Sequence, residues 1–210
     1  MRYKNNFFIQ NKKKFYSLIV IILIIVISIF ISKKMIKNKK NGNNMNSQEI
    51  VDNILNLKSY KSKIKVQVNS NKNQNKYILR QEYNTENGCV QEVIEPENIA
   101  GVKISKKDNN LKIENSQLDL KKVYENYIGL EDNSLDLISF INDYKENSKS
   151  DYDEKNNEII MKTKVNKNNS YLNNKTLYID KESILPKKLI IQDNNQNTTI
   201  FIEYIEIELD

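Results

Sequence analysis

The sequence predicts a mainly β (α+β) domain with a curved antiparallel sheet and helices on its concave face, preceded by one N-terminal transmembrane helix. Two observations support this prediction. Residues 15–32 form an unbroken apolar run, and from residue 59 onward apolar and polar side chains alternate with a period of two, which is typical of half-buried strands. With 210 residues, the chain has room for one such domain beside the apolar helix, because domains commonly hold about 100–200 residues.

The apolar run FYSLIVIILIIVISIFIS contains 18 uncharged residues. As a helix it would span roughly 27 Å, close to the hydrocarbon thickness of a bilayer. A cleaved signal peptide has a shorter apolar region that ends at two small residues two positions apart, and neither such a pair nor a lipidation cysteine follows here. We therefore predict an uncleaved signal-anchor. The residues expected within the membrane include Phe15, Leu18, Ile22, Ile25, Ile29 and Ser32.

Five basic residues precede this run and five follow it, so the positive-inside rule does not orient it. We place the N-terminus in the cytoplasm because a first helix normally inserts like a signal sequence. The predicted organisation is a basic cytoplasmic tail (1–14), the anchor (15–32), a spacer (33–46) and an extracytoplasmic domain (47–210). The domain would then lie outside the cytoplasm.

The net charge of +6 belongs to the N-terminal segment. Residues 1–40 contain ten basic residues and no acidic one, which leaves 23 basic and 27 acidic residues in 41–210, a net charge of −4. Nucleic-acid binding requires a basic patch on the folded domain. No Lys or Arg cluster with interleaved aromatic residues occurs there, so we expect no nucleic-acid partner.

Two helices are expected in the domain. Asn46 and Glu49 have the spacing of a capping box, and apolar residues then line one face of 47–58. The second helix is expected at 134–146, with an apolar side and a polar side. Its apolar side contains Leu137, Ile138, Phe140, Ile141 and Tyr144, and its polar side contains Asp136, Ser139, Asn142 and Asp143.

About nine antiparallel strands are expected from the period-two alternation and the turns between the runs. They cover 60–68, 77–83, 90–95, 102–105, 111–114, 158–165, 171–179, 187–192 and 198–209, and 118–120 is an additional short candidate. In the last strand the apolar positions change from even to odd at Tyr204 and Ile205, which predicts a β-bulge. The predicted core on the concave face contains Ile64, Val66, Leu79, Ile138, Ile141, Leu177 and Ile202.

We predict no catalytic, cofactor or metal site. The chain has no histidine and one cysteine, which excludes catalytic triads with an imidazole base and Cys/His metal sites. Asp151, Asp153 and Glu154 are candidates for acid–base chemistry, but their Asn- and Lys-rich surroundings favour a solvated loop. Cys89 is interpreted as a small buried side chain beside the turn at Asn87 and Gly88; the alternative is a reactive or intermolecular thiol.

Four segments carry a resemblance to a known family. They are YKSKIKVQV (60–68), the strand Tyr77–Tyr83, EVIEPE (92–97) and LYIDKESILPKKLIIQD (177–193), which is followed by an isoleucine-rich final strand. In this order they resemble the LolA-like lipoprotein-carrier superfamily, and within it the GerS-related germination lipoproteins of anaerobic spore formers. The resemblance covers about residues 47–210.

The resemblance implies a half-barrel of antiparallel strands with helices as a lid. It also implies one of two roles, because some members carry lipid-modified proteins and the germination lipoprotein binds a spore-cortex amidase and promotes its activity. A domain tethered by a spanning helix cannot ferry a lipoprotein between membranes. We therefore expect a non-enzymatic module that holds or activates a cell-wall or spore-cortex enzyme such as an amidase. The resemblance also implies a location on the cell surface or in the forespore intermembrane space. The alternative is a LolA-like domain that binds an apolar ligand, such as a lipid, or a lipoprotein.

Overall fold

The computed structural model describes residues 45–70, 72–107, 110–115, 117–126, 135–165 and 172–210. Met45–Asp210 forms one compact unit. The predicted anchor, including Phe15, Leu18, Ile22, Ile25, Ile29 and Ser32, lies outside the described residues. Within the described ranges, no helix is both long and apolar enough to cross a membrane.

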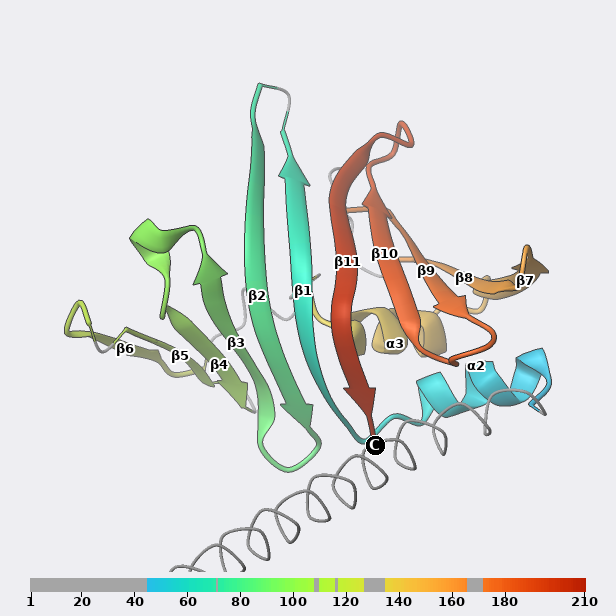
Figure 1. Ribbon diagram of the computed structural model, residues 1–210, viewed down its shortest axis with the longest axis horizontal. Helices are drawn as coiled ribbons and strands as arrows, with labels where there is room; N and C mark the ends of the chain where they lie inside the picture. Colours follow the sequence, from blue (N-terminus) through green and yellow to red (C-terminus); the bar gives the residue numbers. More distant parts are fainter. Residues whose placement is uncertain (1–44, 71, 108–109, 116, 127–134, 166–171) are drawn as a thin grey trace, which may run out of the picture. The chain divides into compact units, whose positions relative to one another are not determined.

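The unit is built on one open, curved sheet of eleven strands, in the order β6-β5-β4-β3-β2-β1-β11-β10-β9-β8-β7 (Figure 1). All neighbouring strands are antiparallel. The strands are β1 (Ser59–Asn69), β2 (Gln74–Asn84), β3 (Gly88–Glu95), β4 (Lys103–Lys107), β5 (Asn110–Asn115), β6 (Leu120–Tyr124), β7 (Asp151–Lys155), β8 (Glu158–Lys164), β9 (Asn174–Asp180), β10 (Pro186–Gln192) and β11 (Thr198–Leu209). The mainly β, antiparallel architecture predicted from the alternation is confirmed.

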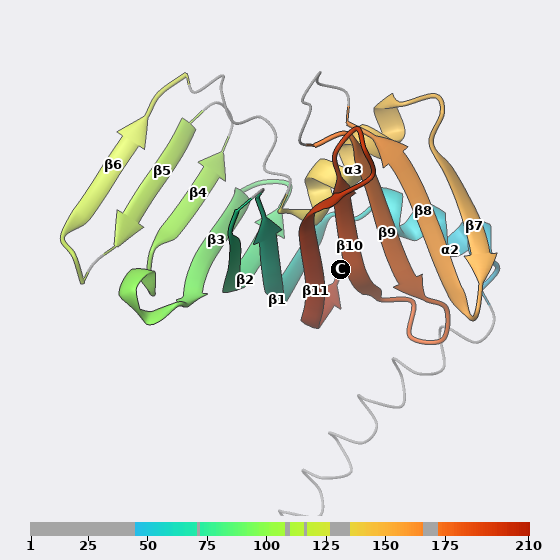
Figure 2. The same cartoon turned by 90° about the horizontal axis from the view of Figure 1, so that it is seen from above.

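Two α-helices, α2 (Ser47–Leu55) and α3 (Leu137–Glu146), lie on the inner side of the curve of the sheet (Figure 2). A short 3-10 helix, η1 (Glu97–Ile99), follows β3. The predicted capping box of α2 is present, because Asn46 and Glu49 each accept a hydrogen bond from the other's backbone N–H. Asp136 caps α3 by accepting from the Ser139 N–H.

The core lies between the two helices and the strands from β8 through β11, β1 and β2. In this region one side chain of every two points inward, so the alternation in the sequence becomes a continuous apolar layer. Among the predicted core residues, Ile64, Val66, Leu177 and Ile202 have no exposed surface, Ile141 and Leu79 are buried, and Ile138 is half-buried.

The bulge predicted in the last strand is confirmed. Lys63 pairs with Glu206, but the next residue, Ile64, pairs with Tyr204. Ile205 is therefore the extra residue, and its side chain is exposed. Because of the bulge, the residues on both sides of Ile205 face the core: Ile202 and Tyr204 before it, at even positions, and Ile207 after it, at an odd position.

Two expectations about polar residues were wrong. Asp151, Asp153 and Glu154 lie on strand β7 rather than in a loop, because β8 provides a pairing edge that a polar segment can use as well as an apolar one. Asp143 was expected on the polar side of α3, but it is buried and paired with Lys175. The helix therefore turns one acidic residue toward the sheet.

Smaller differences concern boundaries. The first helix ends at Leu55 rather than at Lys58, the second begins at Leu137, and β6 runs from Leu120 to Tyr124 rather than over 118–120. We call β3–β6 the wing, and α2, α3, β1, β2 and β7–β11 the covered half. In the described part of the chain, the buried core cluster includes no residue from the wing.

Candidate binding surfaces

A buried ion pair holds α3 against the sheet. The Lys175 side chain on β9 has no exposed surface, and its Nζ lies 2.6 Å from Oδ2 of Asp143 and donates to Oγ of Ser139 at 2.7 Å. Both partners belong to α3, so the ammonium joins the helix to β9. A buried charge that is paired in this way has a structural role and is shielded from any substrate in solvent.

A second polar cluster lies where α3 begins. The Gln81 Nε2 donates to the Leu135 carbonyl at 2.9 Å, and the Tyr60 hydroxyl accepts from the Leu137 N–H at 3.3 Å. Burial raises the pKa of Tyr60 and of the nearby Tyr204, with a further contribution from the Asp136 carboxylate. Both phenols therefore stay protonated at neutral pH and serve packing rather than proton transfer.

Cys89 is the second residue of β3, lies beside this cluster and is half-buried. Burial and the negative charge of Asp136 raise the pKa of its thiol well above the usual value. A reactive cysteine needs the opposite, a lowered pKa in an electropositive setting. The surroundings therefore favour the structural interpretation of Cys89 over the reactive one.

The carboxylates on β7 do not converge on one point. Asp153 Oδ2 lies 3.0 Å from Lys162 Nζ, and Glu154 is bonded to Lys181 and to the Ser47 hydroxyl. Among the described residues, no three His, Cys, Asp or Glu side chains are placed to hold a metal ion. Two of the three residues considered for acid–base chemistry, Asp153 and Glu154, are thus engaged in surface ion pairs.

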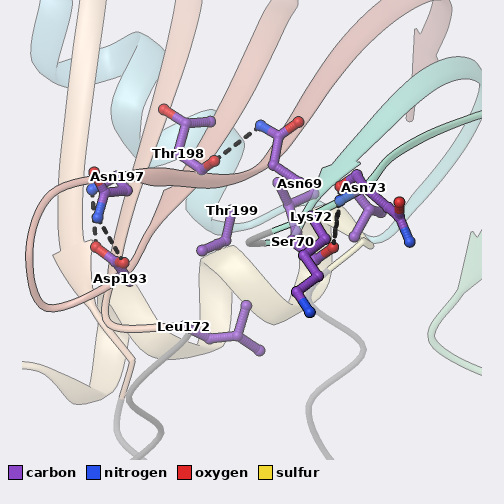
Figure 3. Close-up of a pocket in the computed structure, with 11 residues that line it drawn as sticks. Asn69, Ser70, Lys72, Asn73, Leu172, Asp193, Asn197, Thr198 and Thr199 are labelled. Atoms are coloured by element: carbon purple, nitrogen blue, oxygen red, sulfur yellow. Dashed lines mark hydrogen bonds between the residues drawn. The ribbon is translucent and has the colours of Figure 1, made fainter.

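A groove of about 990 Å³ lies at one end of the sheet, and we call it the end groove (Figure 3). It lies between the β1–β2 turn and the β10–β11 turn. Its apolar floor is formed by Val68, Leu172 and Ile200, all half-buried and packed against the core. Val68 and Ile200 face each other across β1 and β11.

The rim of the end groove is polar and already formed. The Asn69 Nδ2 donates to the Thr198 carbonyl at 2.9 Å, which connects the two turns (Figure 3). In the second turn, the Asn197 side chain and N–H both donate to Asp193, and these bonds lower the pKa of that carboxyl. The Lys72 side chain is exposed on the same rim.

A smaller groove of about 430 Å³ lies at the opposite end of the sheet, between α2 and the C-terminus. The apolar residues that line it include Ile54, Leu57, Ile184 and Leu209. Sequence reasoning did not anticipate either groove, because each is formed by turns or helix ends whose side chains carry no periodic signal.

Sequence reasoning also missed Lys175 and the two sheet edges. Lys175 shares its parity with Leu177 and Ile179, so the alternation in β9 did contain a signal that this lysine points inward. The edges depend on the strand order, in which β6 and β7 lie at the two ends. Three of the exposed large apolar side chains, Leu118, Leu120 and Val123, lie on or next to β6.

Similar architectures occur in proteins of known structure. A chain in the structure of the CwlD amidase from Clostridioides difficile in complex with the GerS lipoprotein is 21% identical and aligns over 79% of this chain and 97% of that chain, with a TM-score of 0.51. The LolA superfamily protein NE2245 from Nitrosomonas europaea is 9% identical, over 79% and 94% of the two chains, with a TM-score of 0.42. No curated protein matches the sequence.

At 21% identity, the likeness to the first of these chains shows a similar fold. The family profile described as "Sporulation protein YdcC-like" matches residues 12–209, nearly the whole chain. The protein therefore belongs to the YdcC-like family of sporulation proteins.

Proposed function

We propose that this protein is a non-enzymatic binding module, tethered to the membrane by residues 15–32, that holds or activates a cell-wall or spore-cortex enzyme such as an amidase outside the cytoplasm. A tethered module can act by raising the local concentration of its partner at the membrane or by stabilising the partner's active state. The proposal needs no catalytic residue in this chain.

The observation that carries the proposal is the filled interior of the covered half. A carrier of an internal ligand needs a preformed apolar cavity. Here the inward side chains of the central strands, such as Ile64, Leu177 and Ile202, have no exposed surface, and Phe140 of α3 packs among them without exposed surface. Such an interior supports binding at the surface over binding inside.

The family and the fold add support. The chain belongs to a sporulation family, and the similar Clostridioides difficile structure holds an amidase together with a lipoprotein. That complex is a property of those proteins. For this chain, an amidase partner is part of the proposal.

The end groove suits a protein partner. Its aliphatic floor of Val68, Leu172 and Ile200 can receive an apolar side chain of the partner. Its polar rim can form hydrogen bonds with the partner's backbone, as the rim of a protein interface does. The exposed Lys72 would attract an acidic residue of the partner. The groove and α2 lie at opposite ends of β1. This strand has 11 residues, which correspond to a length of roughly 36 Å.

The test is reconstitution of a binary complex. The full chain in lipid vesicles would be titrated with each purified cortex amidase encoded in the same genome, and binding and amidase activity would be measured. Lys72→Glu should weaken binding on the order of tenfold. The control, Lys107→Glu, changes an exposed lysine of the wing and should leave binding unchanged. Equal affinity of both variants would reject the end groove as the docking place.

The second candidate function, binding of an apolar ligand, rests on the exposed aliphatic floor of the end groove. It predicts that fatty acid or phospholipid co-purifies with the protein. Mass spectrometry under native and denaturing conditions separates the two functions. A stoichiometric lipid adduct without binding to any amidase would reject the interaction proposal in favour of a carrier.

The tether is tested separately. If residues 15–32 are an uncleaved anchor, the full-length protein should stay in the membrane fraction after carbonate washing, and external protease should digest everything beyond about residue 40. A mature form that begins after residue 32, or a protected C-terminal domain, would contradict the proposed topology.

A further inference from the structure

In the described part of the chain, the sheet ends in two edge strands that run in the same direction. It is open, with β6 at one end and β7 at the other. Every neighbouring pair is antiparallel and the number of strands is odd, so the first and the last strand of the order point the same way. A second copy placed beside the first, with the same face and the same end of the sheet aligned, would therefore bring its β7 parallel to β6.

The register of the outer pairs shows which side chains of the edge strands share a face. On β6, Leu120 and Tyr124 lie opposite the buried Asn115 and Leu111, so even positions face inward. On β7, Tyr152 and Glu154 lie opposite the buried Met161 and Ile159 and also face inward. Asp153 and Lys121 consequently lie on the outer face of the sheet.

The two edges have opposite charge. Both lysines of β6, Lys121 and Lys122, are exposed, and no acidic residue lies on that strand. Strand β7 carries three carboxylates and one lysine. An edge strand with lysines repels another copy of itself and resists unspecific pairing, but it is complementary to an acidic edge.

We propose that β6 of one copy pairs in parallel with β7 of the next copy, so that the sheet continues from molecule to molecule. In the register that keeps the faces aligned, Leu120 lies opposite Tyr152, Lys121 opposite Asp153, and Lys122 opposite Glu154. One apolar pair and two ion pairs result, each between side chains on the same face of the sheet, and Val123 lies opposite Lys155.

Other registers form fewer ion pairs. A shift of two residues in one direction places Lys121 opposite Lys155. A shift in the other direction keeps one ion pair, between Lys121 and Asp151, and places Lys122 opposite Tyr152. Shifts by one residue put inward side chains opposite outward ones. Like charges also oppose β6–β6 and β7–β7 pairing, so the complementary contact is head-to-tail.

The acidic partners remain available although they already pair within their own chain. Asp153 binds Lys162 through Oδ2, and its side chain is 67% exposed. Glu154 binds Lys181, and its side chain is 45% exposed. An ionised carboxylate has about four acceptor positions, so each can accept a second lysine. Pairing would also cover Leu120, which is 42% exposed.

Head-to-tail pairing of this kind does not close on a dimer, and it produces an open array or a ring. Because all copies keep the same face and direction, α2 lies at the same end of every copy, which is compatible with anchors in one membrane. The contact leaves the end groove uncovered. It therefore does not depend on the proposed partner or on the identity of any ligand.

Cross-linking between two cysteine variants tests the contact. Full chains carrying Leu120→Cys or Tyr152→Cys, each with Cys89→Ser, would be reconstituted together in lipid vesicles and oxidised. A disulfide requires the two Cα atoms to lie within roughly 7 Å, as they do between adjacent strands. We expect a cross-linked dimer in the mixture and none with either variant alone.

A charge exchange provides the second readout. Lys121→Glu with Lys122→Glu, or Asp153→Lys with Glu154→Lys, should each lower cross-linking on the order of tenfold when placed in both cysteine chains. Mixing the Leu120→Cys chain that carries the two glutamates with the Tyr152→Cys chain that carries the two lysines should restore it. Restoration cannot arise from misfolding of either variant.

Three outcomes would overturn the proposal. They are absence of the mixed disulfide, a disulfide between two Leu120→Cys chains, and charge variants that do not respond to mixing. Lys107→Glu serves as the matched control, because it changes an exposed lysine of the wing that is not on an edge strand. This control should leave cross-linking unchanged.

Discussion

The covered half and the wing show the same alternation of apolar and polar residues, but their inward side chains are buried to different extents. In the covered half, inward side chains such as Ile64, Leu177 and Leu189 have no exposed surface. In the wing, the buried inward side chains are Gln91, Leu111 and Asn115, two of them polar, and Ile104, Ile113 and Tyr124 remain half-buried. The difference follows the helices, because α2 and α3 pack on the covered half.

The two regions also place their charges differently. The covered half contains the buried pair of Lys175 and Asp143, whereas the pair of Lys112 and Glu114 on the wing, at 2.6 Å, is partly exposed to solvent. Burial strengthens an ion pair and also raises the cost of breaking it, while solvent screens an exposed pair. We infer that stability is concentrated in the covered half and that the wing is free to serve as an association surface.

The largest effect is expected from the buried charge. Lys175→Met should lower the free energy of unfolding by about 3–5 kcal/mol, because it leaves Asp143 buried without its ammonium partner. Urea denaturation followed by circular dichroism measures this. Lys112→Met on the wing is the control and should cost at most about 1 kcal/mol. Similar losses in both variants would remove the distinction between the two regions.

The next effect concerns aliphatic packing. Ile141→Ala should cost about 2–5 kcal/mol, because it opens a cavity beneath α3. Ile138→Ala should cost less, since Ile138 is only half-buried, and Ile113→Ala on the wing should also fall below Ile141→Ala. Denaturation midpoints of the three variants give the order. A wing variant that destabilises as much as Ile141→Ala would show that the wing has a rigid core of its own.

The sequence predicted the covered half better than the wing, for a physical reason. Long strands with one buried face, such as β1 and β11, repeat the alternation over many residues, and even the bulge at Ile205 was visible as a change of parity. β6 and β7 are short and mostly polar. Their strand conformation comes from a neighbouring strand rather than from their own composition, so no local pattern predicted β7.

The candidate surfaces were less predictable than the fold. The end groove brings together residues about 130 positions apart, Asn69 and Thr198, and their proximity follows only from the register of β1 with β11. The buried Asp143 was misassigned because a helical pattern does not reveal that a lysine on β9 points toward it. Conversely, the absence of histidine was decisive from the sequence alone for the chemistries that require an imidazole.

A smaller effect distinguishes two buried phenols in the covered half. Tyr60 accepts a hydrogen bond from the Leu137 N–H, so Tyr60→Phe should cost about 0.5–1.5 kcal/mol. The buried Tyr204 hydroxyl has no hydrogen-bond partner among the described residues, so Tyr204→Phe should be neutral or slightly stabilising. Thermal unfolding of the two variants measures the difference. A loss with Tyr204→Phe equal to that with Tyr60→Phe would indicate a partner for Tyr204 outside the described residues.

The smallest effect is expected at alkaline pH and concerns Tyr144 of α3. Burial, followed by the nearby Asp151 and Tyr152, raises the pKa of this phenol to about 12, above the ordinary value of about 10. The folded state therefore holds the proton more tightly than the unfolded state, and the resulting stability is complete below about pH 10 and lost as the pH rises toward 12. Tyr144→Phe should reduce the slope of stability against pH only in that window. Because the phenol is partly exposed, the change should stay below about 1 kcal/mol, and an identical slope in the variant would show that the more deeply buried Tyr60 and Tyr204 account for the alkaline loss.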